Sequence, residues 1–93
     1  MPVPRIASFG GVVVKLYFGD HPPPHVHVYA GRIGHPGVKA ARFSIDTGEL
    51  IDGGLPPASV ATVTSWCVQH REALRTDWQR ARRNLHPVGR YDQ

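Results

Sequence analysis

The sequence predicts a small α+β domain in which an antiparallel sheet of about four strands packs against one long C-terminal helix. The first half of the chain holds short β-branched and aromatic runs divided by glycine and proline, which is typical of strands and turns. Further on, apolar residues recur at three- and four-residue steps, which indicates an amphipathic helix. A length of 93 residues suits a single domain. The expected bounds are 1–93 for the domain, about 5–55 for the strands, about 57–84 for the helix and 85–93 for a frayed tail.

Alternation defines the most informative of the expected strands. Over residues 25–30 it places His25, His27 and Tyr29 on one face and three apolar residues on the other. An apolar run over 6–14 favours a buried strand over a signal peptide, because it is short and contains two glycines. The other expected strands are 12–18, 38–45 and 49–52, the last two joined by a hairpin turn at 46–48.

One continuous helix is expected to follow the two prolines at 56–57, since the first turn of a helix tolerates proline. His70 and Asp77 fall on its apolar stripe, and any bend is expected near 62–65. Cys67 is expected to be a buried apolar residue and not a nucleophile. The stripe itself consists of Val60, Val63, Cys67, Leu74 and Ala81.

The net charge of +4 is concentrated in the C-terminal part of the chain. From residue 71 onward, six arginines stand against three carboxylates. Such a basic segment favours nucleic acid or an acidic partner protein, and a solvated helix face is the alternative. The candidate residues for binding nucleic acid or a partner are Arg71, Arg75, Arg82 and Arg83.

Composition excludes several classes of protein. A single cysteine rules out an internal disulfide, and no apolar run approaches the ~20 residues that cross a bilayer. We therefore expect no membrane partner and, by elimination, a cytoplasmic location. The sequence has no phosphate-binding glycine loop and no paired carboxylates of glycosidase or two-metal nuclease type. The small size makes a homodimer or a bound partner an option for added stability.

The segment from Asp20 to His27, D-H-P-P-P-H-V-H, carries the chemistry. Histidine is the most common transition-metal ligand and titrates near neutral pH. On an extended strand His25 and His27 point to the same side about 6.5–7 Å apart, so both rings can reach one divalent transition metal. The candidate metal ligands are Asp20, His21, His25 and His27.

The same groups allow two other interpretations. They could transfer protons without a metal, or Asp20 could cap the turn while the strand histidines face solvent. His70, on the apolar stripe, either bonds to the sheet or completes a site with the strand histidines. Asp77 needs a partner if it is buried, and Arg42 is one option. The candidate catalytic residues are His21, His25, His27 and His70.

In these residues the chain resembles a widespread bacterial family of small uncharacterised proteins. The shared features are the D-H-x-P-P-H-x-H motif at 20–27, the short acidic hairpin turn at 47–50, Leu55-Pro56, the W-x-x-x-H spacing over 66–70 and Trp78. The chain departs from the pattern in extra loop residues at 34–37 and in Asp77, where family members usually carry Asn. The second departure places any role inferred for position 77 in doubt.

The resemblance implies a function by association. Members are often encoded beside a second small protein, an arrangement that looks like a toxin–antitoxin pair. It implies a small cognate protein as partner and, for a toxin, RNA as the target of a histidine-dependent ribonuclease. The residues themselves keep two alternatives open, a metal-binding protein or metalloenzyme that uses the same cluster and a non-catalytic regulatory or interaction module.

Overall fold

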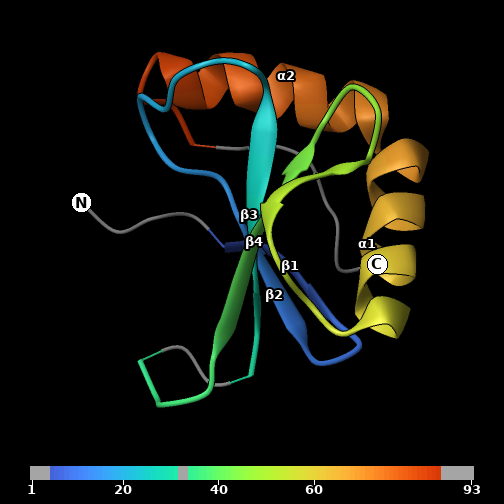
Figure 1. Cartoon of the computed structure of the whole chain (residues 1–93). Helices are drawn as coiled ribbons and strands as arrows, with labels where there is room; N and C mark the ends of the chain where they lie inside the picture. The colour runs from blue at the N-terminus through green and yellow to red at the C-terminus, as the bar shows by residue number, and fades with distance from the viewer. Residues whose placement is uncertain (1–4, 32–33, 87–93) are drawn as a thin grey trace.

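The computed structural model describes residues 5–31 and 34–86, which form a five-stranded sheet and two helices. The α+β class is confirmed, with one strand more than expected. The strands follow the chain order β1-β2-β3-β4-β5, and every neighbouring pair is antiparallel. Their bounds are β1 Arg5–Phe9, β2 Val12–Lys15, β3 His25–Ala30, β4 Lys39–Ser44 and β5 Leu50–Gly53 (Figure 1).

The additional strand arises where one apolar run becomes a hairpin. Residues 6–14 do not form one strand, because Gly10 and Gly11 reverse the chain between β1 and β2. Their φ angles of 53° and 80° are both positive, as a two-residue hairpin turn requires and as glycine readily allows. Apolar residues on both sides of the turn made the run look continuous in the sequence.

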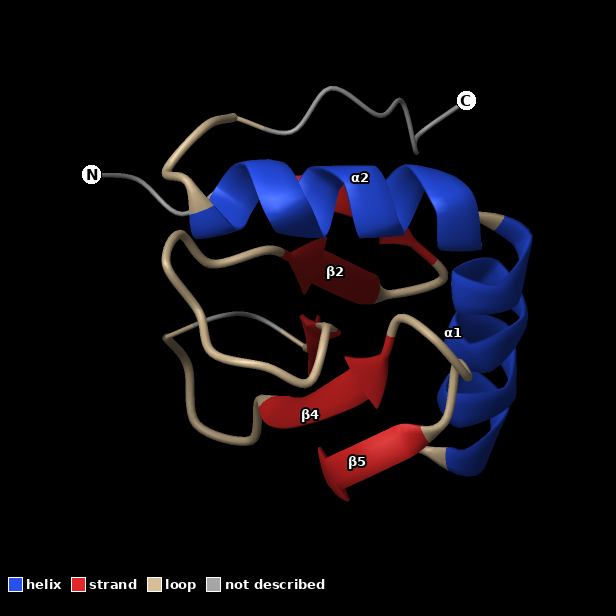
Figure 2. Cartoon of the chain, turned by 90° about the horizontal axis from the view of Figure 1, so that it is seen from above, coloured by secondary structure: helices blue, strands red, loops and turns tan. Residues whose placement is uncertain are grey.

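The helical part is two helices, α1 Pro57–Gln69 and α2 Arg71–Arg82, so the prediction of one continuous helix is wrong. The break lies at His70, which has a φ of −106° and a ψ of 19°, and not at 62–65. The two helices run in different directions, α1 beside the sheet and α2 across it (Figures 1 and 2). A single non-helical residue hardly disturbs the apolar periodicity, which explains why the sequence pattern concealed the break.

The core lies between the helices and one face of the sheet. Alternate strand residues such as Val14, Val28 and Phe43 are fully buried against the helices. From the helices, the core receives Val63, Trp66, Cys67, Leu74 and Trp78, which confirms the predicted stripe in most positions. The intervening strand residues, Lys15, His27 and Arg42 among them, are only partly buried and belong to the other face of the sheet.

We call this second face the open face. It is defined by Lys15 of β2, His27 and Tyr29 of β3, Arg42 of β4 and Asp52 of β5. Arg42 uses its guanidinium there to bind Asp52, and Asp77 is fully buried. No helix in the described part of the chain is long and apolar enough to cross a membrane.

Gly53 of β5 lies close to the backbone of β4, so its substitution tests the packing at this edge of the sheet. A Cβ at this position would lie 2.3 Å from the Ala40 carbonyl oxygen, and its φ is +79°. Gly37 has a similar φ of +89° but open space around it. We expect Gly37→Ala to lower the free energy of unfolding by about 1–2 kcal/mol, the cost of a left-handed residue, and Gly53→Ala to lower it by clearly more. Denaturant unfolding of both variants measures the difference, and equal losses would contradict the packing described here.

Cys67 provides a second test of the core. Burial raises the pKa of its thiol to about 12, and the side chain is fully buried. We expect native protein at pH 8 to react with a thiol reagent roughly a thousandfold more slowly than denatured protein, because thiolate is the reactive form. Rapid labelling of the native state would show that the α1–sheet interface opens readily.

Candidate metal centre

Asp20, His25 and His27 meet where β3 begins. One ligand atom from each lies within 4.8 Å of the others. The turn that brings Asp20 back over β3 is held at both ends by backbone hydrogen bonds. The Gly19 N–H donates to the Ala81 carbonyl at 2.9 Å, and the Ile45 N–H donates to the Pro24 carbonyl at 3.0 Å.

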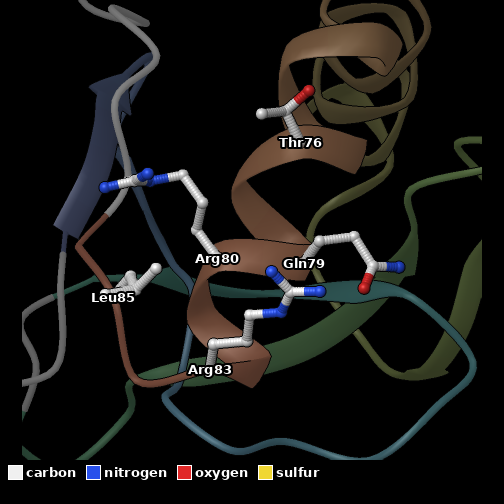
Figure 3. Close-up of a pocket in the computed structure, with 5 residues that line it drawn as sticks. All are labelled: Thr76, Gln79, Arg80, Arg83 and Leu85. Carbon is white, nitrogen blue, oxygen red and sulfur yellow. The ribbon is translucent and has the colours of Figure 1, made fainter.

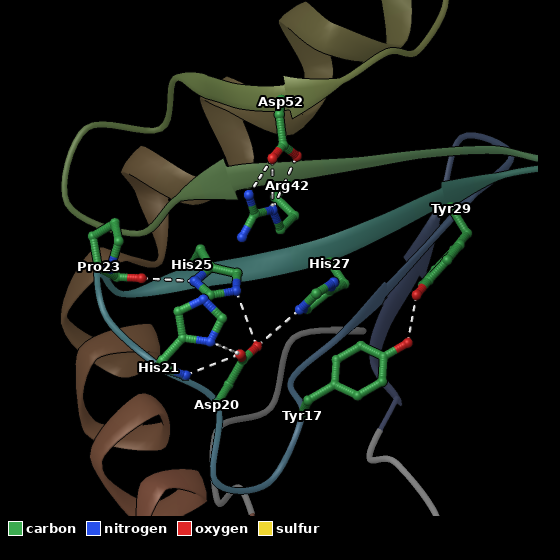
Figure 4. A network of polar contacts seen from close by, with 9 residues as sticks. All are labelled: Tyr17, Asp20, His21, Pro23, His25, His27, Tyr29, Arg42 and Asp52. Atoms are coloured by element: carbon green, nitrogen blue, oxygen red, sulfur yellow. Dashed lines mark hydrogen bonds and ion pairs between the residues drawn. The ribbon is translucent and has the colours of Figure 1, made fainter.

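The Asp20 carboxylate is the hub of the cluster. Its Oδ2 lies 2.9 Å from Nε2 of His25 and 2.9 Å from Nε2 of His27. Its Oδ1 accepts a hydrogen bond from the His21 backbone N–H at 2.9 Å. One carboxylate oxygen is thus shared by two imidazoles while the other holds the turn (Figure 4).

The proton positions on His25 are constrained by its neighbours. Its Nδ1 lies 2.6 Å from the Pro23 carbonyl oxygen, which can only accept, so Nδ1 carries a proton and donates it. In a neutral imidazole Nε2 then has only a lone pair, and it faces the Asp20 carboxylate. Nε2 is buried and makes no hydrogen bond among the described residues, although the carboxylate oxygen is 2.9 Å away. If the ring is neutral, two lone pairs therefore face each other without a proton between them; if it is protonated, the Nε2–H forms an ion pair with the carboxylate.

The surroundings of His25 make this arrangement costly. The ring is only 1% exposed, and it packs against the Trp78 ring with the centroids 5.2 Å apart. A buried polar nitrogen without a partner costs about 1–3 kcal/mol. A cation bound by Nε2 and the carboxylate would remove that cost.

His27 occupies the solvent side of the cluster. Its side chain is 23% exposed, and its Nε2 donates a hydrogen bond to Oδ2 of Asp20. Partial burial lowers the pKa of His27 more than the hydrogen bond from its ring to Asp20 raises it. Neutral imidazole, the form that binds metals, is therefore favoured.

Asp20 is held in its charged form. Partial burial alone would raise the pKa of its carboxyl group, but hydrogen bonds from the His27 ring and the His21 backbone leave the pKa below its ordinary value. The cluster thus presents one carboxylate and two imidazoles, a donor set common to catalytic zinc and to mononuclear non-haem iron sites.

Two of the predicted site histidines lie outside this group of three. His21 is at the rim, with a 78% exposed side chain whose Nδ1 is 3.3 Å from Oδ1 of Asp20. His70 lies at the junction of α1 and α2, where its ring packs on Trp66 with the centroids 5.3 Å apart. That junction is at the opposite end of α2 from the turn that carries Asp20 (Figure 1). Two histidines and one carboxylate make up the centre.

The predicted basic residues are distributed along α2. Arg75 binds Asp46 at 2.9 Å and Glu72 at 3.5 Å. Arg71 is half-buried at the start of the helix and Arg82 is exposed near its end. Arg83 helps to line a cavity of about 340 Å³ (Figure 3). The residues that line this cavity are Thr76, Gln79, Arg80, Arg83 and Leu85.

The sequence reasoning missed the groups that surround the centre on the open face. The Tyr17 ring stands edge-on to His27 with the centroids 4.2 Å apart, and its hydroxyl shares a hydrogen bond with that of Tyr29. Burial, followed by this hydrogen bond, raises the pKa of Tyr29 to about 12. Lys15 and Arg42 pair with His27 across the strands, and only the strand register could have revealed them.

Comparison with known proteins gives a family without an assigned function. Residues 11–79 match the family described as a domain of unknown function (DUF4160), and this range includes the whole cluster. No curated protein and no solved structure matches the chain. The match covers most of the sequence, and the chain belongs to the DUF4160 family.

Proposed function

We propose that the protein is a mononuclear metalloenzyme of hydrolytic type, in which Asp20, His25 and His27 bind one divalent transition metal. The observation that carries the proposal is the buried Nε2 of His25, which faces the Asp20 carboxylate without a hydrogen bond. Its tautomer is fixed by the bond from Nδ1 to Pro23, the same arrangement by which metal-binding histidines are oriented in known sites.

The distances within the cluster suit one ion. Two ligands that each bind zinc at about 2.0–2.1 Å in a tetrahedral site are about 3.3 Å apart. The two distances from Oδ2 to the imidazole nitrogens are 2.9 Å, so a shift of a few tenths of an ångström would admit the ion. Binding of the ion at Nε2 of His27 would require the neutral tautomer of this ring with its proton on Nδ1, while the Nδ1–H of His25 would stay in place.

Three protein ligands leave a coordination position for water, as catalytic zinc sites do and structural sites do not. His27 and Asp20 lie at the open face and retain some exposure, 23% and 13%, so substrate can approach from that side. A bound divalent metal lowers the pKa of its water ligand and makes it a nucleophile near neutral pH. Hydrolysis is the reaction class that this supports.

A second candidate is a metal-free, histidine-dependent ribonuclease. It is favoured by the hydrogen bond that orients His27 on Asp20 and by the exposed ring of His21 beside the same carboxylate, because a positioned base and an exposed acid can share a proton transfer. We also propose, from the resemblance to bacterial DUF4160-type proteins with the D-H-x-P-P-H-x-H motif, a toxin–antitoxin-type role in the cytoplasm with a small cognate partner.

Zinc titration of the purified protein tests the metal site. We expect one ion per chain, observed by calorimetry and by metal analysis after dialysis. His27→Ala and Asp20→Asn are each expected to weaken binding by more than ~100-fold, since even groups that only hydrogen-bond to ligands change metal affinity by about 10- to 100-fold. His21→Ala should retain the site, because His21 does not belong to the group of three.

Circular dichroism of each variant separates loss of metal from loss of fold. His27 is partly exposed, so its replacement is the safest of the ligand variants, and His35→Ala in an exposed loop is the matched control. Wild-type protein that binds no zinc, cobalt or iron would overturn the proposal. If His21→Ala weakens zinc binding as much as His27→Ala does, the metal ligands include the exposed His21 and the proposed set of three ligands is wrong.

Growth during expression tests the role in cells and distinguishes the two candidates. We expect expression of the protein alone to slow growth, and co-expression with its genomic neighbour to restore it. Under the metal proposal, His27→Ala abolishes the effect and His21→Ala does not, whereas a metal-free ribonuclease loses activity with either variant and keeps it in the presence of a chelator in vitro. Harmless expression of soluble wild-type protein would contradict a toxin role.

A further inference from the structure

We propose that the open face binds a phosphate ester, with Lys15 and Arg42 as the groups that hold its oxygens beside the metal. The inference rests on the proposed function and names the substrate class of that same site. It comes from a row of side chains that crosses four strands and has the metal ligand His27 inside it.

The strand register defines this row. Lys15 of β2 is directly opposite His27 of β3, His27 is opposite Arg42 of β4, and Arg42 is opposite Asp52 of β5. Directly opposed residues in antiparallel strands have Cβ atoms about 4.5–5.5 Å apart and point to the same face. A cationic side chain therefore lies on each side of His27, the proposed metal ligand that belongs to the open face.

Arg42 is held in a fixed orientation by Asp52. Its Nε lies 2.9 and 3.0 Å from the two carboxylate oxygens, and its Nη2 also bonds to Asp52. Nη1 takes no part in these bonds, and the head group lies on the His27 side of the sheet (Figure 4). The pair therefore keeps the guanidinium in place while one edge stays available, the planar donor arrangement that suits phosphate oxygens.

Lys15 is the second cation of the row. Its ammonium lies 5.9 Å from the centre of the Tyr29 ring, and no carboxylate among the described residues forms an ion pair with it. The hydroxyl contact with Tyr17 holds Tyr29 in place, and the Lys15 ammonium can interact with the face of the Tyr29 ring. Because the lysine side chain has a flexible four-carbon stem, the ammonium can turn from this ring toward a bound anion.

Charge and geometry favour a phosphate ester over a carboxylate. With a divalent ion bound, the ion, Lys15 and Arg42 outweigh Asp20 and Asp52 by about two positive charges. Lys15 and Arg42 then flank His27 on either side, and the ion would be bound by the same residue. A phosphate ester offers tetrahedrally arranged oxygens, three of them non-bridging in a monoester, to groups on different sides, whereas a carboxylate offers two oxygens in one plane.

Hydrolysis at this position balances without another reactant. The oxygen of a water molecule bonds to phosphorus while the bond from phosphorus to the leaving oxygen breaks. One water proton ends on the leaving oxygen and the other on the phosphate product. The metal and the two cations stabilise charge that develops on the non-bridging oxygens.

The test uses the zinc-loaded full chain with inorganic phosphate as the binding probe. We expect Lys15→Met and Arg42→Gln each to weaken phosphate binding by about tenfold or more, the typical cost of one hydrogen bond to a charged group, with one zinc per chain retained. Lys39→Met, the same substitution on β4 but on the other strand alternation, should leave phosphate affinity unchanged. Hydrolysis of bis(p-nitrophenyl) phosphate, of p-nitrophenyl phosphate and of p-nitrophenyl acetate then identifies diester, monoester or uncharged substrates.

The outcomes separate this inference from the metal proposal. Zinc binding without phosphate binding, or phosphate affinity that Lys15→Met and Arg42→Gln leave unchanged, would overturn the inference and leave the metal site standing. Hydrolysis of the acetate alone would do the same. Absence of zinc binding would overturn the metal proposal itself, and with it the basis for this substrate class. A native circular dichroism spectrum of Arg42→Gln would show that loss of the ion pair with Asp52 leaves the fold intact, so that weaker phosphate binding comes from the missing guanidinium.

Discussion

The bond from His25 Nδ1 to the Pro23 carbonyl is the constraint on which the site depends. It fixes the tautomer of a ring that is 1% exposed and directs the other nitrogen toward Asp20. The rest of the local structure serves this placement. The proline-rich turn carries both the carbonyl and the carboxylate, Trp78 closes the space behind the ring, and β3 adds His27 two residues later on the same side of the strand. A cluster of three side chains is thereby defined by one buried imidazole.

Much of the fold could be predicted from local patterns. The α+β class, the strand at 25–30 with its alternation and the hairpin at 44–50 follow from turn chemistry and period-two alternation. Two features could not be predicted, because each depends on a single position inside a continuous apolar pattern. Gly10-Gly11 divides one run into two strands, and His70 divides one helix into two.

The candidate site shows the same limit. Short spacing along the chain suggested a site of Asp20, His21, His25 and His27, and three of these, without His21, have ligand atoms within 4.8 Å of one another. Helical periodicity suggested His70, which the break places at the far end of α2. One of the alternatives left open, that His25 and His27 both face solvent, does not hold for His25, which is covered by Trp78. Lys15 and Arg42 were not assigned to the site, since only the strand register places them beside His27.

The backbone hydrogen bond from Gly19 to Ala81 links the candidate metal centre to the folding and local unfolding of α2. It fastens the turn that carries the carboxylate to the last turn of α2, so the cluster is complete only when that helix is docked. An ion that binds the complete cluster must then draw the helix end into the same cooperative unit. Slower amide hydrogen exchange in the last turn of α2, about fifty residues along the chain from His27, would be the sign of that linkage.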